Sequence, residues 1–574
     1  MAGRPSRAAL DRTVHTALEH HRAGRLAAAE PLYREVLAAD PNHADALNLL
    51  GMLAQQVGRL DVARELIGKA VAAAPRFAEA HNNLASVLLA LDDLASAETH
   101  YRRAIALEPA HVGARINLGN LLWRAGRFAD AATACREALA RAPRSAEAHN
   151  NLGNALKGLG DLDGARAAYR QAVALNDGYA AAHSNLGNLL CDVGEFAAAL
   201  PHYERAVALA PTFADYHMNL GNALRDLARL PEAIACYERA LALDPALADA
   251  EWNLATALLV GGDLARGWRA FEKRWQTRRL APHRRNLPAP LWDGSDPAGR
   301  TILLPAEQGL GDVIQFCRYL PLLHARGART ILLIDGVWRQ LAPLLRSLDG
   351  VDVLALDLAE TGRFDLHCPL LDLPGRLGTT LATVPAAVPY LAADDGARER
   401  WRARLADDGA PRVGLVWAGT RHNPRDRLRS LPLERLRPLI ELPGLRWFGL
   451  QVGDGRRDLD DTAMPHGFTD LGPELHDFVD TAAALDALDL VISVDTSVAH
   501  LAGALARPVW LLMPTAPDWR WLLEREDSPW YPTARVFRQA TSGVWDPVIA
   551  RMRDELIALA AGDRSRLIAH AAGA

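Results

Sequence analysis

The chain has 574 residues, half of them hydrophobic, and a formal net charge of −5. This length and composition predict several folded domains and exclude a largely disordered chain. The acidic balance argues against a protein that binds nucleic acid or an anionic membrane. The five cysteines show no metal-binding spacing and indicate reduced thiols. The chain starts without a signal-peptide pattern, and no apolar run is long enough for a transmembrane segment, so we expect a cytoplasmic protein.

Residues 10–281 repeat at an interval of 34 residues, which is typical of tetratricopeptide repeats. Alanine recurs once per period, tyrosine often follows it four residues later, and proline closes most of the units. Small residues let the paired helices touch, aromatic residues fill the space between them, and proline ends the second helix. We therefore predict eight helix pairs that stack into an α-superhelix with a concave groove.

Asparagine recurs with the same period on the first helix of the units. One series is Asn83, Asn117, Asn151, Asn185, Asn219 and Asn253, and a second is Asn120, Asn154, Asn188 and Asn222. A side-chain amide offers both a donor and an acceptor, so such a ladder can hold the backbone of a protein or peptide acceptor in the groove. The alternative is that these amides join one repeat to the next. This half resembles the superhelix of O-linked N-acetylglucosamine transferases, in which such a ladder grips the acceptor protein.

The last repeat departs from the pattern and becomes aromatic. Gly267 replaces the small alanine, and Trp252, Trp268, Phe271 and Trp275 are concentrated in this unit. A terminal repeat has to cover its open end, so we expect it to dock onto the following domain. Residues 282–300, rich in proline and glycine, are predicted to be a linker.

In the second half, apolar strands alternate with helices. This pattern predicts a Rossmann-like domain at 301–395, an interdomain helix or linker at 396–411, and a second Rossmann-like domain with a final helix at 412–574. The expected strands are Thr301–Pro305, Thr330–Ile334, Val351–Leu356, Val413–Trp417, Leu445–Gln451, Leu490–Val494, Val509–Met513 and Val536–Phe537. Two such domains in tandem are the layout of the α/β GT-B fold, in which ligands bind at the carboxyl ends of the strands.

The junction after the predicted strand Leu490–Val494 is a candidate anion site. Asp495, Thr496 and Ser497 lie where a helix must begin, and His500 lies within reach of the same turn. The free N–H groups and positive dipole end of a helix N-terminus bind anions without a metal. The alternative is structural, because Thr and Ser cap helices widely and a lone His is usually packed.

The first domain has a comparable strand-to-helix turn that runs from Glu307 to Asp312. It lacks the third glycine of a dinucleotide fingerprint, and no P-loop lysine follows. Asp312 and Glu307 are the candidate general bases, and helix capping is the structural alternative for Asp312.

Several motifs together resemble glycosyltransferase family 9, the bacterial heptosyltransferases. They are Gly311-Asp312-Val313 with Pro321, Asp495-Thr496-Ser497 with His500-Leu501-Ala502, Val413 to Gly419, and Arg429 to Pro432. The resemblance implies that Asp312 is the base and that Asp495, Thr496, Ser497 and His500 hold the donor diphosphate. It also places Trp417, Gly419 and Arg429 on the donor side. Ser497 stands where that family usually has glycine, and Arg429 where lysine is common.

The whole chain resembles bacterial fusions of repeats with a glycosyltransferase. We therefore expect a metal-independent transfer of a sugar from a nucleotide-sugar donor to a protein held by the repeats. The nucleotide sugar is a substrate, so no cofactor and no metal are expected, and no nucleic-acid partner. One alternative is a non-catalytic adaptor with a degenerate nucleotide-sugar-binding domain. Another is a glycosyltransferase that acts on a surface polysaccharide.

Overall fold

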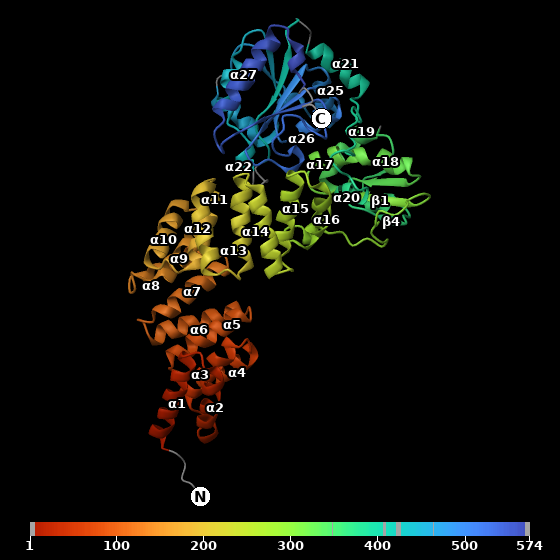
Figure 1. The fold of residues 1–574 in the computed structure, drawn as a ribbon. Coiled ribbons are helices and arrows are strands. Elements are labelled where there is room, and N and C mark those ends of the chain that lie inside the picture. Colours follow the sequence, from red (N-terminus) through yellow and green to blue (C-terminus); the bar gives the residue numbers. More distant parts are fainter. Residues whose placement is uncertain (1–5, 347, 406–408, 421–425, 463, 569–574) are drawn as a thin grey trace. The chain divides into compact units, whose positions relative to one another are not determined.

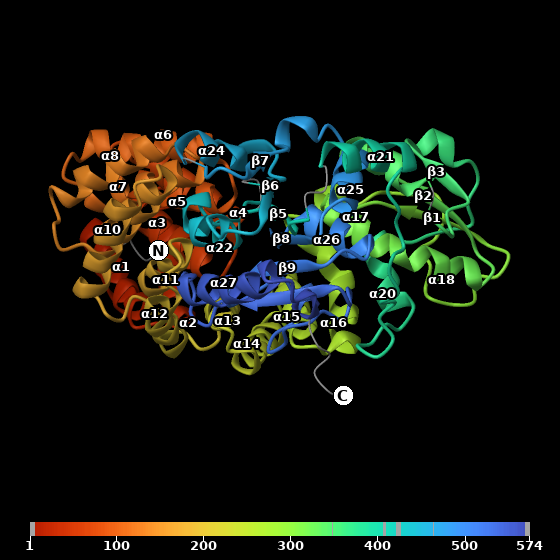
Figure 2. The same cartoon turned by 90° about the horizontal axis from the view of Figure 1, so that it is seen from above.

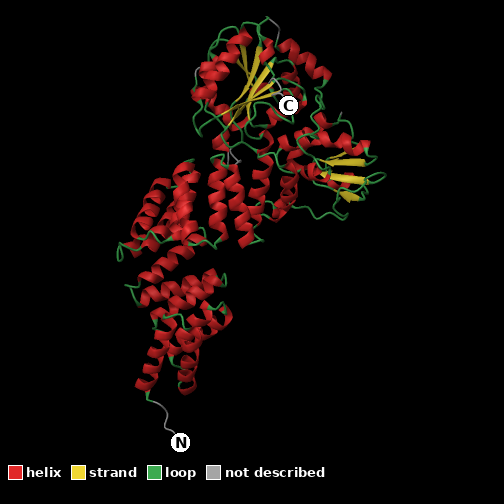
Figure 3. Cartoon of the chain, in the orientation of Figure 1, coloured by secondary structure: helices red, strands yellow, loops and turns green. Residues whose placement is uncertain are grey.

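The computed structural model describes residues 6–568 except 347, 406–408, 421–425 and 463. The chain divides into two compact units, Met1–Pro211 and Thr212–Ala574. The division falls within the repeats, so the last two repeats belong to the same unit as the strands. Figure 3 shows the strands confined to two groups, both in the second unit.

The first unit consists of helix pairs, drawn in red to orange-yellow in Figure 1. Its helices are α1 (Arg7–Arg22), α2 (Leu26–Ala39), α3 (Ala44–Gln56), α4 (Leu60–Ala73), α5 (Ala78–Ala90), α6 (Leu94–Leu107), α7 (Val112–Arg124), α8 (Phe128–Leu139), α9 (Ala146–Gly158), α10 (Leu162–Leu175), α11 (Ala180–Asp192) and α12 (Phe196–Leu209). This periodic stack confirms the predicted repeats, because each pair covers the apolar face of its neighbour.

The small residues of the repeat have a steric role within each helix pair. A Cβ added at Gly153 would lie 2.5 Å from the ring of Tyr169, and one at Gly187 would lie 2.8 Å from the ring of Tyr203. Both tyrosine side chains are buried. Glycine on the first helix therefore lets the tyrosine of the second helix pack against the backbone, which fixes the pairing.

The asparagine side chains of the first unit join neighbouring repeats. The amide of Asn83 donates to Asn48 at 3.1 Å, that of Asn117 to Asn82 at 3.0 Å, and that of Asn185 to Asn150 at 2.9 Å. In the second series, Asn154 and Asn188 each accept a hydrogen bond from a tyrosine hydroxyl at 2.7 Å. The bonds of the first series join one repeat to the next, as the structural alternative predicted, whereas those of the second series lie within one helix pair.

The second unit begins with two further repeats, built from α13 (Ala214–Asp226), α14 (Leu230–Leu243), α15 (Ala248–Val260) and α16 (Leu264–Phe271). The expected docking of the last repeat is confirmed by its aromatic contacts. The rings of Trp268 and Phe271 lie 5.1 Å and 6.2 Å from that of Trp519, which follows a strand of the second sheet. Arg376 also pairs with Glu272 at 3.0 Å. The repeat is thereby fixed to both sheets of the unit.

The first sheet is parallel, with strand order β3-β2-β1-β4. Its strands are β1 (Thr301–Pro305), β2 (Arg329–Leu333), β3 (Val353–Ala355) and β4 (Leu366–His367), and its helices are α17 (Leu310–Phe316), α18 (Leu320–Ala325), α19 (Ala342–Leu345) and α20 (Leu373–Arg376). The short strand β4 was not predicted. Its two residues are too few to give an apolar pattern.

The second sheet is also parallel, with order β10-β9-β8-β5-β6-β7. Its strands are β5 (Arg412–Val416), β6 (Arg446–Gly449), β7 (Phe468–Asp470), β8 (Leu490–Val494), β9 (Val509–Met513) and β10 (Ala534–Arg538). The helices of this region are α21 (Asp395–Arg404), α22 (Asp426–Arg429), α23 (Arg437–Ile440), α24 (Asp458–Asp461), α25 (Phe478–Asp486), α26 (Ser497–Ala504) and α27 (Asp546–Ala560). Strands β8 and β9 are buried throughout, as expected for central strands of a parallel sheet.

The predicted linker at 282–300 is packed along the first sheet. The backbone N–H of Trp292 donates to the carbonyl of His367 at 2.8 Å, and the Trp292 side chain is fully buried. Leu291 forms a parallel bridge with His367. This stretch therefore extends the edge of the sheet beside β4.

Candidate active site

One cavity of about 2450 Å³ brings together most of the catalytic and donor-side residues singled out in the sequence. Its lining comes from the carboxyl ends of β1, β5, β8 and β9, from the turns that follow them, and from α15 and the segment after α16. The predicted residues on its lining are Glu307, Asp312, Gly419, Arg429, Asp495, Thr496, Ser497 and His500. The ends of parallel strands are the usual place for ligands in such sheets.

The start of α26 offers backbone donors to this cavity. Thr496 is the N-cap residue, and its hydroxyl contacts that of Ser493 at 3.1 Å instead of capping the helix. Among the described residues, none accepts a hydrogen bond from the backbone N–H groups of Ser497 and Val498. A helix N-terminus with unpaired N–H groups on a cavity wall is suited to an anionic group.

Two titratable side chains flank this helix start. Burial, reinforced by the charge of Asp518, raises the pKa of Asp495 to about 6. Burial lowers the pKa of His500 well below its usual range, so its imidazole is neutral at physiological pH. His500 Nε2 lies 3.8 Å from Asp495 Oδ1, while Nδ1 lies 3.0 Å from the hydroxyl of Tyr531. The imidazole is thus held in place by its partners and by stacking on Trp521.

Arg429, the last residue of α22, lies beside the turn that follows β8. Its guanidinium donates to the backbone carbonyl of Asp495 at 2.6 Å and to Asp426 at 3.1 Å. A Cβ at Gly419 would collide with Arg429 and Asp426, which explains the need for glycine there. The predicted donor residue Trp417 does not line the cavity. It is fully buried, and its indole N–H donates to the carbonyl of Gly455 at 3.1 Å.

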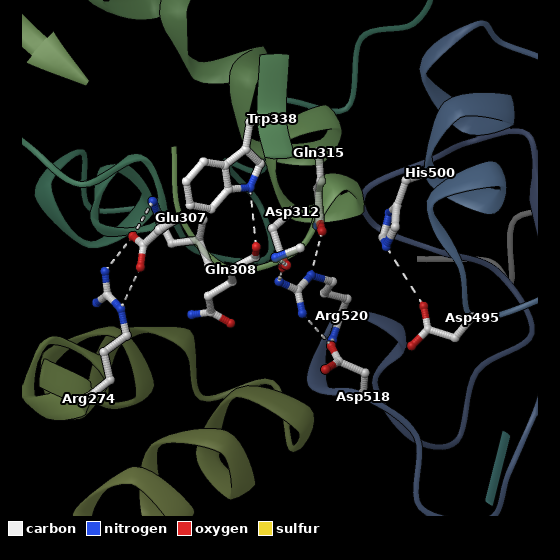
Figure 4. Close-up of polar contacts among 12 residues, drawn as sticks. Arg274, Glu307, Gln308, Asp312, Gln315, Trp338, Asp495, His500, Asp518 and Arg520 are labelled. Atoms are coloured by element: carbon white, nitrogen blue, oxygen red, sulfur yellow. Dashed lines mark hydrogen bonds and ion pairs between the residues drawn. The ribbon is translucent and has the colours of Figure 1, made fainter. Parts of the chain in front are cut away.

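Asp312 is engaged on both carboxylate oxygens. One oxygen accepts the backbone N–H of Gly309 at 2.7 Å in a capping arrangement at the start of α17. The other forms an ion pair with Arg520, which also binds Asp518 at 2.7 Å and the side-chain oxygen of Gln315 at 2.6 Å (Figure 4). Burial raises the pKa of Asp312, and the positive charge of Arg520 opposes that rise.

Glu307, the competing candidate base, is held in a buried ion-pair cluster. Its two carboxylate oxygens accept bonds from Arg274 at 2.6 Å and 3.1 Å, and the backbone N–H of Leu371 donates to it at 3.1 Å. Arg274 also pairs with Asp372. This cluster ties the last repeat to the first sheet, so Glu307 has a structural role that accounts for all its contacts.

The two strand-to-helix turns meet each other across the cavity. A Cβ added at Gly311 would lie 2.8 Å from His500 Cδ2 and 3.4 Å from the Cα of Ser497. Figures 1 and 2 both show α17 beside α26. The absence of a side chain at Gly311 therefore lets the two helix N-termini approach closely, with Asp312 next to that contact.

Arg520 and Asp518 are the site residues that sequence reasoning did not identify. They follow β9 in a stretch without a recognised motif, and arginine is so common in this chain that an isolated one carries no signal. In the described part of the chain, no group of three or more His, Cys, Asp or Glu side chains is placed to hold a metal ion. Nor does that part contain a helix long and apolar enough to cross a membrane.

Comparisons with known proteins identify the helical half. Tetratricopeptide repeat families match residues 20–87, 78–111, 116–182, 178–246 and 218–283. The N-terminal half of the chain thus consists of tetratricopeptide repeats. Solenoids of this kind use their extended surfaces for binding, so protein–protein interaction is the function indicated for this half.

A curated relative is Protein FlbA of Caulobacter vibrioides, which is 31% identical over 320 residues. The match covers 52% of this chain and 53% of the relative, so the chain spans about half the length of that protein. Among solved structures, MamA is 26% identical with a TM-score of 0.27, covering 29% of this chain and 92% of the other. The Cut9–Hcn1 complex gives a chain that is 17% identical with a TM-score of 0.40, covering 47% and 53%.

Proposed function

We propose that the chain is a metal-independent glycosyltransferase of the GT-B type that transfers a sugar from a nucleotide-sugar donor to a protein. The observation that carries the proposal is the meeting of two strand-to-helix turns at one cavity. One turn provides unpaired N–H groups and is contacted by Arg429 of α22, and the other turn provides Asp312. These are the two requirements of glycosyl transfer, a stabilised leaving group and a base.

The donor diphosphate would bind at the start of α26. There the N–H groups of Ser497 and Val498, the Arg429 guanidinium and the neutral imidazole of His500 can donate to phosphate oxygens. The acceptor hydroxyl attacks the anomeric carbon, and the bond from that carbon to the phosphate oxygen breaks with its electron pair leaving on the phosphate. Asp312 takes the proton of the hydroxyl, and burial supports this role because it raises the pKa of the carboxyl.

The second candidate function is a non-catalytic adaptor that senses a nucleotide sugar. It is favoured by one observation, the engagement of both oxygens of Asp312 by Gly309 and Arg520. As an enzyme, the chain has to release Arg520 from Asp312 when substrates bind. As a sensor, it can keep that ion pair intact.

Incubation with UDP-, GDP-, ADP- and CMP-sugars tests the proposal. A donor that binds the native state should raise the melting temperature, and the enzyme should hydrolyse that donor slowly in the absence of an acceptor. Asp312→Asn should abolish the hydrolysis while the stabilisation remains. Stabilisation without any hydrolysis by the wild type would favour the sensor. The absence of both effects with every donor would refute nucleotide-sugar binding.

A further inference from the structure

The segment that follows α16 carries a concentration of positive charge at the cavity. Residues 273–285 contain six Lys or Arg residues and no Asp or Glu, in a chain whose net charge is −5. Two of the six are in ion pairs: Arg274 with Glu307 and Asp372, and Arg285 with Asp335 at 2.6 Å. The other four Lys and Arg side chains, together with the side chain of His283, are exposed. We call them the basic strip: Lys273, Arg278, Arg279, His283 and Arg284.

The basic strip faces the cavity and lacks internal partners. Four of its members, all except Arg278, line the cavity. Among the described residues, no ion pair or side-chain hydrogen bond involves any member of the strip. An exposed cation is normally solvated, but several held on one cavity wall create a local positive potential that attracts an anionic ligand.

Six of the seven acids on the same lining already have an arginine partner, and the seventh, Asp495, lies 3.8 Å from His500. Arg376 pairs with Glu272, Arg520 pairs with Asp312 and Asp518, and Arg457 lies 3.3 Å from Asp454. Glu307 and Asp372 are held by Arg274. Among the described residues, the Lys and Arg side chains of the strip are therefore left without an acidic partner on this lining.

The backbone that carries the strip is held in place at both ends. Charges on such a backbone bind a partner with a smaller loss of entropy than charges on a mobile tail. Arg274, at one end of the segment, is completely buried in its ion-pair cluster. Next to it, the hydroxyl of Thr277 donates to the Arg274 carbonyl at 2.7 Å, and Arg285 forms two bonds to Asp335 at the other end. Side chains on a fixed backbone lose less entropy when a partner binds.

The position of the strip relative to the reacting groups is set by a chain of contacts. Arg274, within the same segment, binds Glu307, which starts the turn that leads to Asp312. Gly311, beside Asp312, contacts His500 on the donor side of the cavity. Figure 4 shows Arg274 and His500 on opposite sides of Asp312. The segment that carries the strip is thus joined through Arg274 and Glu307 to the turn of Asp312, and four strip members line the same cavity.

We infer that the basic strip binds an acidic segment of the acceptor protein and presents a neighbouring hydroxyl to Asp312. This inference rests on the proposed function, because it assigns the acceptor side of the same cavity. The strip adjoins tetratricopeptide repeats, whose binding surfaces suit a polypeptide. The acidic chain as a whole opposes a long polyanion such as a nucleic acid.

The experiment uses the full chain and measures fluorescence anisotropy with three labelled probes at low salt. The probes are a short peptide of Asp and Glu around a central Ser, the same peptide with Lys in place of the acids, and a single-stranded oligothymidylate of similar length. We expect the acidic peptide to bind most tightly and its affinity to fall as salt is raised. Equal binding of the acidic and basic peptides, or tighter binding of the oligonucleotide, would overturn the inference.

A charge-reversal variant locates the binding. Lys273→Glu, Arg279→Glu and Arg284→Glu together should weaken the acidic peptide by about tenfold or more, since each reversal turns an attraction into a repulsion. The matched control reverses three exposed arginines of the same unit that lie outside the cavity lining: Arg300, Arg326 and Arg363. The control should stay within about twofold of the wild type. Equal losses in both variants would mean that general charge, and not the strip, attracts the peptide.

The same preparations separate this inference from the proposed function. Nucleotide sugars should stabilise the strip variant as they stabilise the wild type, because the proposed diphosphate contacts come from α26 and Arg429 and not from the strip. If nucleotide sugars bind and the acidic peptide shows no preference, only the acceptor assignment fails. If no nucleotide sugar binds the wild type, the proposed function fails and the acceptor assignment fails with it.

Discussion

Replacement of Asp312 by asparagine should tighten the binding of a nucleoside diphosphate. Asparagine has the same shape and can still accept the backbone N–H of Gly309, so α17 keeps its cap. The change removes one of the two carboxylates that bind the Arg520 guanidinium, and leaves Asp518 as its ionic partner. Arg520 lines the same cavity as the start of α26, so its positive charge becomes more available to a phosphate.

The size of the effect follows from the contacts of Arg520. A hydrogen bond to a charged group contributes about 1.5–3 kcal/mol. Asp518 and Gln315 still hold the guanidinium after the substitution, so only part of that energy is transferred to the ligand. We therefore expect about 1–2 kcal/mol, which corresponds to roughly tenfold in Kd.

Calorimetric titration of UDP, GDP and ADP measures the effect in a double-mutant cycle of Asp312→Asn and Arg520→Gln. The gain should vanish in the Arg520→Gln background, because it acts through that guanidinium. Arg520→Lys should retain part of it. Asp454→Asn is the matched control, since Asp454 lines the same cavity and pairs with Arg457.

A gain that persists without Arg520 would refute the reasoning, because it would come from reduced repulsion between Asp312 and the phosphate. Unchanged or weaker binding by Asp312→Asn would refute it as well. In either case the role of Arg520 would be limited to the ion pair that joins the segment after β9 to Asp312, and its guanidinium would not bind the donor phosphate.

Four further outcomes are expected. His500→Ala and Thr496→Val should each weaken binding of the stabilising nucleotide sugar by about 1–3 kcal/mol in calorimetry, and undiminished affinity in both would remove the donor site from α26. Deletion of residues 1–211, which form the first unit, should abolish modification of a protein acceptor but spare donor hydrolysis, and normal modification by the truncated chain would contradict this role of the repeats. Arg274→Met leaves two buried carboxylates unpaired and should lower the free energy of unfolding by about 3–5 kcal/mol in urea titrations, whereas a loss below about 1 kcal/mol would mean that the cluster is weak. Burial raises the pKa of Asp495 from 3.8 to about 6, so the contribution of this carboxyl to stability is fully present below about 4 and is lost as the pH rises through about 6. Asp495→Asn should remove up to about 3 kcal/mol of this pH dependence, measured as the difference in the free energy of unfolding between variant and wild type at several pH values.

The central strands could be predicted from the sequence because a strand buried on both faces is a local run of apolar residues. The predicted bounds of β1, β8 and β9 agree with the structure, since each is an apolar run flanked by turn residues. The juxtaposition of Gly311 with His500 could be expected only in outline, because strand ends meet at one edge of a parallel sheet while the close approach depends on tertiary packing.

Other features leave no trace in the sequence. The buried indole N–H of Trp417 donates to the carbonyl of Gly455, in a short 3-10 helix 38 residues further along the chain. The pairing of Arg520 with Asp312 joins residues 208 positions apart, and no periodic pattern connects them. The boundary between the two units after Pro211 could not be predicted either, because the period of 34 residues continues through it without a change of register.

That break has a consequence for how such chains can change in length. The two repeats that carry the contacts to the sheets, α13 to α16, form one body with the cavity, while the six upstream pairs belong to another. Repeats added to or lost from the upstream stack would leave the cavity wall, the Arg274 cluster and the basic strip untouched. Selection for a new partner protein can therefore act on repeat number without disturbing the cavity, as long as the last two repeats stay in place.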